Sequence, residues 1–388
     1  MDRVDSTTRD PGLGEQESLP PSLPEASPAR ERSTAEKLTR GIYWLLRFTF
    51  ALFLFIGALQ IMKEGAAGLD FLKAGGYLVR NAGSTLGLGW LGALFVLSGS
   101  PIAATSLTLV SADHISEIQG FTMLTGSRLG AAFVVLVTAV IYALRGGTGE
   151  RLKPVSTAVI ALSTTALIYI PSALIGFMLL RWGPFHSLEL QFPGQFSDVI
   201  DIVYGGILDR LAGLPGLVLF LGGLGILLIS FKFIDSVMPQ LDDRAVEERR
   251  LSWLKKKWPM FGLGSLVALI TMSVSVALTV LVPLVAKRYV KREHIIPYIM
   301  GANITTLGDT MLAAFALNSP AAVRIVLAQT IATTILSIIL LTFFYPQMRS
   351  AIWKFHRKMI KSKVRLAGFT AGLFIVPIAT IAIAGVVG

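Results

Sequence analysis

The sequence contains no cysteine and few charged residues, and each shortage excludes a class of protein. Without cysteine, the chain of 388 residues has no disulfide, no thiolate metal site and no cysteine nucleophile. Charged residues make up 15% of the chain, too few to cover a water-facing surface, since soluble proteins carry about 25%. Hydrophobic residues make up 53%, in runs long enough to cross a bilayer, and no alternating pattern predicts barrel strands. The composition predicts an all-α polytopic membrane protein.

The basic residues outnumber the acidic ones and lie in a few short segments. The formal net charge is +11. Lys and Arg gather between the apolar runs, in residues 145–153, 236–258, 287–293 and 346–365. The positive-inside rule produces this distribution in cytoplasmic loops. We therefore attribute the charge to membrane topology and expect a lipid bilayer, not nucleic acid, as the partner.

Nine apolar stretches follow a polar amino-terminal segment. Residues 1–38 are rich in Pro, Ser, Glu and Arg, which predicts a disordered tail. Seven of the stretches predict membrane spans, at about 41–62, 118–144, 155–181, 211–235, 295–317, 322–345 and 366–387. The last would be an extra C-terminal transmembrane helix. The other two stretches, 86–111 and 260–286, are related to each other.

These two stretches carry the same pattern at the same spacing. Each contains a Ser-x-Ser pair, at residues 98–100 and at residues 273–275. A Gly-(Ser/Ala)-(Arg/Asn)-(Leu/Ile) element begins 26 residues after each pair, at Gly126 and at Gly301, so the unit recurs after 175 residues. Polar residues repeated at fixed spacing in lipid-facing sequence are typical of a functional site. We interpret the repeat as the transport site of a membrane carrier.

The charge of the loops indicates whether the two stretches cross the membrane. If neither crosses and the amino terminus is cytoplasmic, all four basic segments lie inside and the acidic segment 182–210 lies outside. If both cross, basic residues of 145–153 and 236–258 move outside and the acidic segment moves inside. Orientation follows the Lys/Arg bias of short loops. We therefore predict two re-entrant helical hairpins, with a cytoplasmic amino terminus and an extracytoplasmic carboxy terminus in the cytoplasmic (plasma) membrane.

The predicted hairpins divide the chain into two halves of opposite orientation. Each arm of about 12 residues rises about 18 Å, which reaches just past mid-membrane. The first repeat, 41–181, and the second, 211–345, are separated by the extracytoplasmic loop 182–210. Secondary transporters use such inverted repeats and bind substrate at the midplane on broken helices. The predicted fold is an all-α membrane protein with inverted-topology repeats, each containing a re-entrant hairpin.

The hairpin tips supply groups that could bind a ligand. In the first tip, Gly99 is predicted to end one half-helix, Ser100 to cap the next, and Pro101 to occupy its first turn. The second tip lacks Gly and Pro, so its break is predicted from the repeat and the loop charges. The tip hydroxyls are those of Ser98, Ser100, Ser273 and Ser275. Free N–H groups there favour an anion and free carbonyls a sodium ion; the alternative is that the serines only pack helices.

Arg128 is the second predicted component of the site. It lies about ten residues, or about 15 Å, into its span, where a guanidinium group costs several kcal/mol. Two compatible interpretations remain open. Arg128 could bind an oxyanion through its forked donors, or it could form an ion pair with Asp309, the only carboxylate deep in an apolar span.

Asn303 occupies the position of Arg128 in the second repeat. Neutral oxygens at this level suit sodium or hydrogen bonds to an oxyanion. We assign cation binding or gating to the residues that follow: Thr305, Thr306, Asp309 and Thr310. Polar side chains on neighbouring spans, such as Gln329, Thr333 and Thr165, could line a pathway, although helix packing accounts for them better.

These motifs resemble the type II sodium–phosphate cotransporters and their bacterial relatives. In that family each repeat carries a Gln-Ser-Ser-Ser tip, followed at this spacing by a Gly-Ala-Asn-Ile-Gly-Thr segment. Residues 300–306, Met-Gly-Ala-Asn-Ile-Thr-Thr, are similar to the second segment, and Gly126 and Gly130 keep the frame of the first. The resemblance covers about residues 41–345. It implies a sodium-coupled phosphate carrier in which both tips bind substrate and cation.

The chain also departs from the family's pattern at the tips. Leu97 and Met272 stand where the family has glutamine, and Gly99 and Val274 each replace a serine. Arg128 stands where the family has asparagine. One interpretation is that Arg128 supplies the positive charge that a cation would otherwise bring.

The leading hypothesis is a secondary transporter of inorganic phosphate or a related oxyanion, coupled to sodium. Its substrate would bind Ser98, Gly99, Ser100, Arg128, Ser273, Ser275 and Asn303. We expect no catalytic residue, no organic cofactor and no metal site other than one for a coupling sodium ion. A non-transporting sensor or scaffold of the same fold is an alternative. An intramembrane serine enzyme would need a base beside Ser98 or Ser100, and all four histidines are predicted in or beside loops.

Overall fold

The computed structural model describes residues 34–69, 78–145, 152–183, 185, 194–237, 256–286 and 290–387. These residues form helices and short connections, with no strand among them. Six helical segments of this described part are long and apolar enough to cross a membrane: Ile42–Ala67, Glu117–Leu144, Pro154–Arg181, Gly216–Ile234, Pro320–Thr342 and Lys363–Val386. The chain is therefore an all-α polytopic membrane protein, as its composition predicts.

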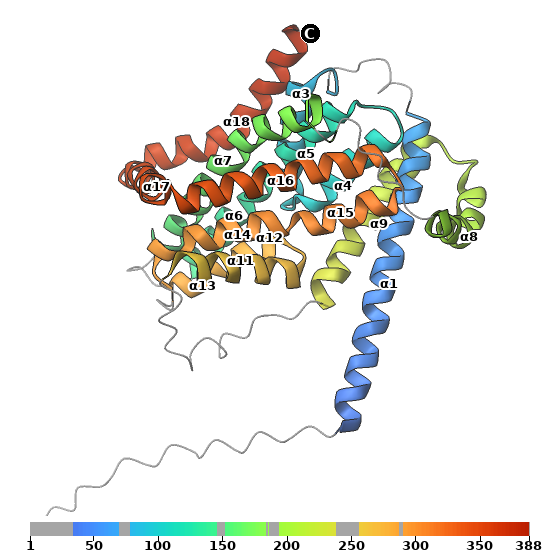
Figure 1. The fold of residues 1–388 in the computed structure, drawn as a ribbon, viewed down its shortest axis with the longest axis horizontal. Helices are drawn as coiled ribbons and strands as arrows, with labels where there is room; N and C mark the ends of the chain where they lie inside the picture. Colours follow the sequence, from blue (N-terminus) through green and yellow to red (C-terminus); the bar gives the residue numbers. More distant parts are fainter. Residues whose placement is uncertain are drawn as a thin grey trace, which may run out of the picture. The chain divides into compact units, whose positions relative to one another are not determined.

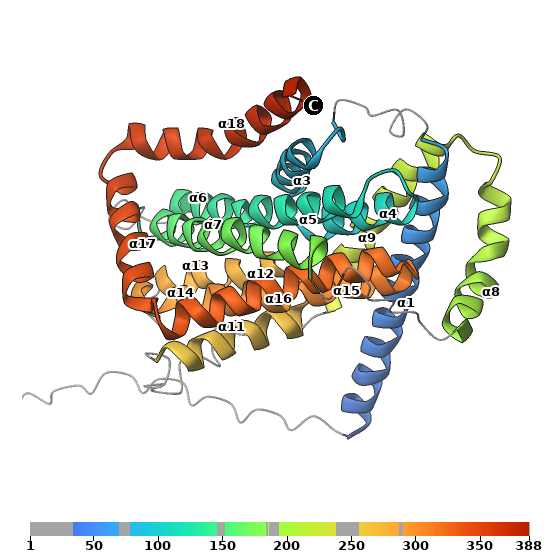
Figure 2. The same ribbon diagram turned by 45° about the horizontal axis from the view of Figure 1, so that its top comes forward.

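The chain divides into two compact units, residues 1–44 and residues 45–388. The first described helix, α1 (Thr34–Ala67), begins within the first unit. The disordered tail predicted for residues 1–38 is thus wrong for residues 34–38, which are helical, and residues 1–33 lie outside the described residues. The helices and contacts described below belong to the second unit, residues 45–388 (Figures 1 and 2).

The first predicted hairpin region is a helix pair with a sharp break. Helix α3 (Ala82–Val96) ends at Leu97, whose backbone is left-handed at φ 56°, and α4 (Ser100–Ser111) follows. The predicted span 118–144 is also broken, at Ala132, between α5 (Glu117–Ala131) and α6 (Phe133–Arg145). Helix α7 (Leu152–Arg181) completes this half and matches the predicted span 155–181.

The second half repeats this order of helices. Helix α11 (Lys257–Thr271) ends at Met272, again left-handed at φ 46°, and α12 (Val274–Thr279) and α13 (Leu281–Ala286) follow. After a 3₁₀ turn (Arg292–His294), the predicted span 295–317 is divided by Thr306. Its two parts are α14 (Ile295–Thr305) and α15 (Leu307–Ala316). Helix α16 (Pro320–Thr342) forms the next span.

The two halves share the same close helix packing at an offset of 175 residues. Helices α3 and α11 are both 15 residues long, and their closest packing partners are α5 and α14. A Cβ on Gly126 would lie 2.0 Å from the Leu86 carbonyl oxygen, and one on Gly301 would lie 2.1 Å from that of Phe261. All four positions obey the offset, so the sequence repeat is also a repeat of backbone packing.

Two segments predicted as loops are helices. The predicted loop 182–210 contains most of α8 (Gly194–Leu211), because Tyr204 anchors this segment to α1. The Tyr204 ring stacks on Phe53 at 5.1 Å, and its hydroxyl donates to the Phe53 carbonyl oxygen at 2.8 Å. The predicted loop 346–365 is largely α17 (Tyr345–Ile360), which buries Met348, Ile352 and His356 at helical spacing. The remaining helices are α9 (Gly216–Val237) and α18 (Lys363–Val387).

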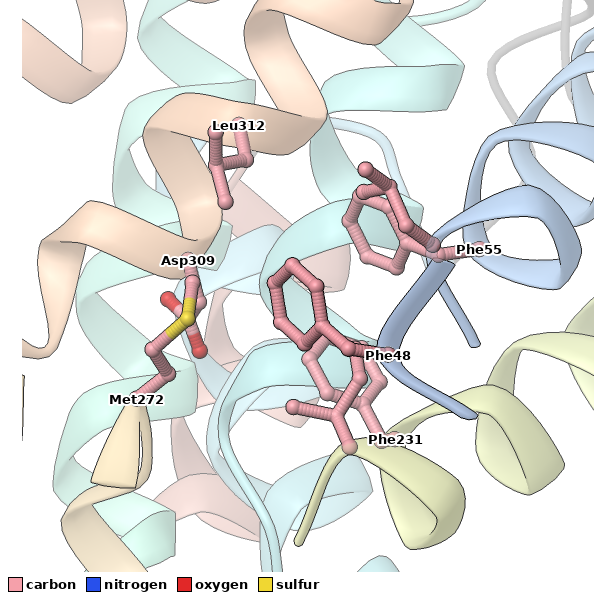
Figure 3. A pocket seen from close by; sticks show the side chains of 8 residues that line it. Phe48, Phe55, Phe231, Met272, Asp309 and Leu312 are labelled. Atoms are coloured by element: carbon pink, nitrogen blue, oxygen red, sulfur yellow. The ribbon is translucent and has the colours of Figure 1, made fainter. Parts of the chain in front are cut away.

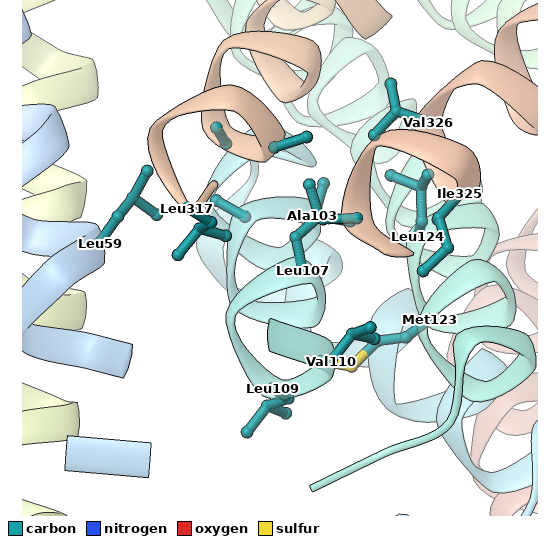
Figure 4. Close-up of a cluster of buried hydrophobic side chains, with 14 of the residues drawn as sticks. Leu59, Ala103, Leu107, Leu109, Val110, Met123, Leu124, Leu317, Ile325 and Val326 are labelled. Carbon is teal, nitrogen blue, oxygen red and sulfur yellow. The ribbon is translucent and has the colours of Figure 1, made fainter. Parts of the chain in front are cut away.

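The second arm of each broken stretch lies in an apolar core of its own. Leu107 and Val110 of α4 pack with α1, α5, α15 and α16 in the cluster of Figure 4. Leu278 of α12 and Val282 of α13 belong to a second cluster, which includes α6, α7 and α14. The two breaks are therefore held from both sides by packed helices.

Candidate functional site

The first break is shaped by close packing against α5. Gly99 is the N-cap of α4, and a Cβ there would lie 2.9 Å from both the Ser127 carbonyl oxygen and the Ala131 Cβ. The predicted roles of Gly99 and Ser100 are wrong, because Leu97 ends the first helix and Ser100 starts α4 without capping it. Pro101 lies in the first turn of α4, as predicted. Gly99 is needed for this close approach. In the described part of the chain, the hydroxyls of Ser98 and Ser100 have no hydrogen-bond partner.

The predicted break in the second stretch is confirmed, because α11 ends at Met272 although no Gly or Pro lies there. Ser273 is the N-cap of α12, and its hydroxyl accepts a hydrogen bond from the Val276 amide at 3.3 Å. Ser273 thus performs the capping predicted for Ser100, so its hydroxyl is already engaged. Ser275 lies in α12, and its side chain lies outside the described residues.

Arg128 and Asp309 form the buried ion pair that the sequence predicts. The Arg128 Nη2 and Asp309 Oδ1 atoms are 3.6 Å apart, and the two side chains are only 1% and 3% exposed. Thr310 joins them, since its hydroxyl accepts from Arg128 Nη2 and donates to Asp309 Oδ1 at 2.8 Å. In the described structure Arg128 Nε and Asp309 Oδ2 are buried without a partner. The pair therefore keeps one free donor and one free acceptor.

Asn303 occupies the position equivalent to Arg128 and lies on the α7 side. Its amide donates to the Thr165 hydroxyl at 3.2 Å, and its backbone carbonyl accepts from the Tyr169 hydroxyl at 2.6 Å. Tyr169 therefore holds the backbone at Asn303. No pattern in the sequence indicates this contact, because a tyrosine in an apolar span is unexceptional.

Thr305 and Thr306, which were assigned to cation binding or gating, donate hydrogen bonds to backbone groups at the break between α14 and α15. The Thr305 hydroxyl donates to the Ser265 carbonyl oxygen on α11 at 2.9 Å. The Thr306 hydroxyl donates to the Asn303 carbonyl oxygen at 3.3 Å. These hydroxyls satisfy backbone groups where the helix is interrupted. Of the four residues assigned to cation binding or gating, only Asp309 and Thr310 lie at the ion pair.

A small cavity of about 20 Å³ lies between Asp309 of the ion pair and Met272 at the second break (Figure 3). Asp309 and Met272 line it together with a set of apolar side chains: Phe48, Leu52, Phe55, Phe231, Ile234 and Leu312. None of the described lining residues of this cavity belongs to the first tip. The first tip instead leads into α4, which packs on α15, the helix of Asp309.

A neighbouring polar contact joins α5, α7 and α16. Thr125 donates to the Gln329 side-chain oxygen at 2.6 Å, and the Gln329 amide donates to the Ser172 hydroxyl at 3.4 Å. All three side chains are fully or almost fully buried. The packing role favoured for Gln329 is thus confirmed.

A second buried cluster lies at the other end of α7 and contains a histidine. His356 of α17 is within 2.5 Å of the Ser156 hydroxyl, measured from Nε2, and Arg292 Nη1 donates to the same hydroxyl at 2.7 Å. The expectation that every histidine lies in or beside a loop is therefore wrong for His356. A serine beside a histidine suggests a nucleophile and base. However, His356 Nδ1 has no orienting partner in the described structure, and Ser156 is 1% exposed.

The His356 cluster predicts acid sensitivity. Burial, with the nearby charges of Arg292 and Arg357, lowers the pKa of His356 from 6.5 to about 4. The unfolded chain therefore takes up a proton on His356 as the pH falls below about 6.5, while the folded chain resists it until about 4. Folding stability should fall by up to about 3 kcal/mol across this window. Thermal unfolding in detergent from pH 7 to 4 should show a smaller loss for His356→Gln; an equal loss would contradict the assignment.

Comparison with known protein families, with characterised proteins and with solved structures finds no match for the chain.

Proposed function

We propose that the protein is a secondary transporter of inorganic phosphate or a related oxyanion. The observation that carries the proposal is the buried Arg128, which keeps an unpartnered Nε beside the Asp309 carboxylate. A fixed guanidinium with a free donor suits an oxyanion. The resemblance to type II sodium–phosphate cotransporters supports the same substrate class, and it depends on the motif residues alone.

The proposed architecture is a pair of inverted repeats with re-entrant hairpins. Helix α3 rises about 22 Å and α4 about 18 Å, both short of the roughly 30 Å hydrocarbon layer. The basic segments support hairpins that enter from opposite sides, with the amino terminus cytoplasmic and the carboxy terminus extracytoplasmic in the plasma membrane. The packing repeated between α3–α5 and α11–α14 supports two equivalent halves.

In the proposed cycle, an oxyanion competes with Asp309 for Arg128. As substrate binds the guanidinium group, the Asp309 carboxylate loses its counterion, which is costly in a buried site. A sodium ion at Asp309 and the Thr310 hydroxyl would compensate that charge, since carboxylate and hydroxyl oxygens suit a hard cation. Substrate and cation therefore bind together, which couples their movement.

Flux measurements test the proposal directly. Proteoliposomes containing the protein should take up radiolabelled phosphate, and a sodium gradient should increase the initial rate. Ser98→Ala with Ser100→Ala should lower the rate at least several-fold at unchanged stability, because these hydroxyls have no partner to lose. Ser350→Ala, on the exposed face of α17, is the matched control.

The opposite result would favour a different function. If phosphate, arsenate and sulfate all fail to move with folded protein, the transporter proposal is wrong. The absence of both tip glutamines, replaced by Leu97 and Met272, then favours the non-transporting sensor. Flux without any effect of sodium would retain the transporter and remove the sodium coupling.

A further inference from the structure

A large apolar groove lies away from the Arg128 site, between α7, α17 and α18. Its volume is about 570 Å³. The walls include Leu167 and Ile170 of α7, Phe355 of α17, and Phe369 and Leu373 of α18. No charged residue lines it within the described structure, and its one hydroxyl, that of Ser163, donates to the Val159 carbonyl oxygen at 2.7 Å. The lining of the groove is therefore suited to an apolar ligand, because its one hydroxyl is already hydrogen-bonded.

One end of the groove is closed at a corner between two helices. The Phe355 and Phe369 rings meet edge to face with centroids 5.6 Å apart, where α17 passes into α18. Figure 2 shows α17 standing across the ends of α16 and α18. Because both of those helices are long and apolar enough to span a membrane, we place α17, which joins them, at the membrane surface. The corner is therefore at the level of lipid headgroups.

Basic side chains surround this corner. Lys354 follows the lining residue Ala351 by one turn of α17, Lys358 follows Phe355 by one turn, and Arg365 precedes Phe369 by one turn of α18. This spacing places all three beside the groove wall. They are exposed, and residues 345–388 contain seven basic and no acidic side chains. A positive corner above an apolar groove is complementary to an anionic headgroup with an acyl chain.

The groove and its basic corner together have the length of one leaflet. From Arg365 to Val376, which lines its far part, α18 rises about 17 Å. Half of a hydrocarbon layer of roughly 30 Å is about 15 Å. An acyl chain whose headgroup sits at the corner would thus be covered along its length.

We propose that this groove binds an anionic phospholipid, with an acyl chain against α7 and α18 and its phosphate at Lys354, Lys358 and Arg365. The site is independent of the oxyanion site at Arg128. A zwitterionic lipid with the same chains should fill the groove without gaining the charge interaction. Each basic residue near an anionic lipid contributes about fivefold in affinity, so loss of all three should weaken binding on the order of 100-fold.

Filling the groove provides the first test. Gly372 lines it, and a Cβ there meets no atom within 4 Å, so Gly372→Phe should occupy the groove without disturbing the fold. Gly368 lies one turn earlier, is equally open and does not line the groove, which makes Gly368→Phe the matched control. Native mass spectrometry of the full chain with phosphatidylglycerol should detect bound lipid in the wild type and in Gly368→Phe, and at least tenfold less in Gly372→Phe.

Removing charge provides the second test and does not depend on that variant folding. The triple change of Lys354, Lys358 and Arg365 to Gln should lose the preference for phosphatidylglycerol over phosphatidylcholine. The same number of changes at the exposed Arg181, Arg210 and Lys232 should preserve it. Equal binding of the two lipids to the wild type would overturn the proposal. So would a dimer in the mass spectrum that Gly372→Phe converts to monomer, because a second copy would then cover the groove.

Discussion

Replacing Arg128 with glutamine should destabilise the folded protein by about 3–5 kcal/mol. The change removes the only cation paired with Asp309, whose side chain is 3% exposed and whose Oδ2 atom already lacks a partner in the described structure. A charge left unpaired in a buried site costs far more than the pair itself contributes. Thermal or chemical unfolding in detergent measures the loss. Arg210→Gln, at an exposed position of α8, should change stability by less than about 0.5 kcal/mol.

A double variant separates the structural role of the pair from its proposed transport role. Arg128→Gln combined with Asp309→Asn removes both charges and should recover most of the stability lost by Arg128→Gln alone. If the two changes are simply additive, the ion pair does not account for the loss. A stable double variant should still lack phosphate flux, because the guanidinium donors are gone; retained flux would contradict the substrate role of Arg128.

An asparagine at position 128 provides a second test of the substrate role of Arg128. Arg128→Asn places asparagine where the sodium–phosphate cotransporters have it. When it is combined with Asp309→Asn to avoid an unpaired carboxylate, phosphate flux should be lost as in the glutamine variant, because neither side chain supplies the guanidinium donors. Flux in the asparagine variant would show that the guanidinium group is not needed, and would assign Arg128 to stability alone.

The sequence predicts those features that depend on spacing and burial. The 175-residue offset of Gly126 and Gly301 reappears as helix packing, and the depth of Arg128 and Asp309 in apolar sequence predicts their pairing. The break at Met272 is predicted through the repeat, although its local residues carry no turn signal. These features follow from residue spacing and from burial in apolar segments, and the tertiary contacts agree with both.

Other features depend on contacts that no local pattern records. Leu97 adopts a left-handed backbone because Gly99 must sit directly on α5, and leucine itself gives no sign of that conformation. Ser156 and His356 meet across 200 residues. Helix α8 forms where charge and apolar content resemble a loop, because Tyr204 docks on α1. Each case is a tertiary contact that overrides the local signal.

Gly126→Ala and Gly301→Ala should each destabilise the protein by about 3 kcal/mol or more. A Cβ at either position would lie 2.0–2.1 Å from a carbonyl oxygen of the facing helix, and that atom belongs to a backbone that cannot turn aside. The cost should be similar at the two positions, because the atoms they meet, on Leu86 and Phe261, are themselves 175 residues apart.

A glycine on the same packed helix supplies a control of opposite sign. Gly262 lies in α11 beside Phe261, but a Cβ there meets no atom within 4 Å. Gly262→Ala should therefore raise stability by roughly 0.5–1 kcal/mol, because alanine favours a helix over glycine. Unfolding of the three variants in the same detergent distinguishes close packing from a general intolerance of glycine substitution. Unequal losses at Gly126 and Gly301 would mean that the two halves share a sequence pattern without sharing the packing that the pattern encodes.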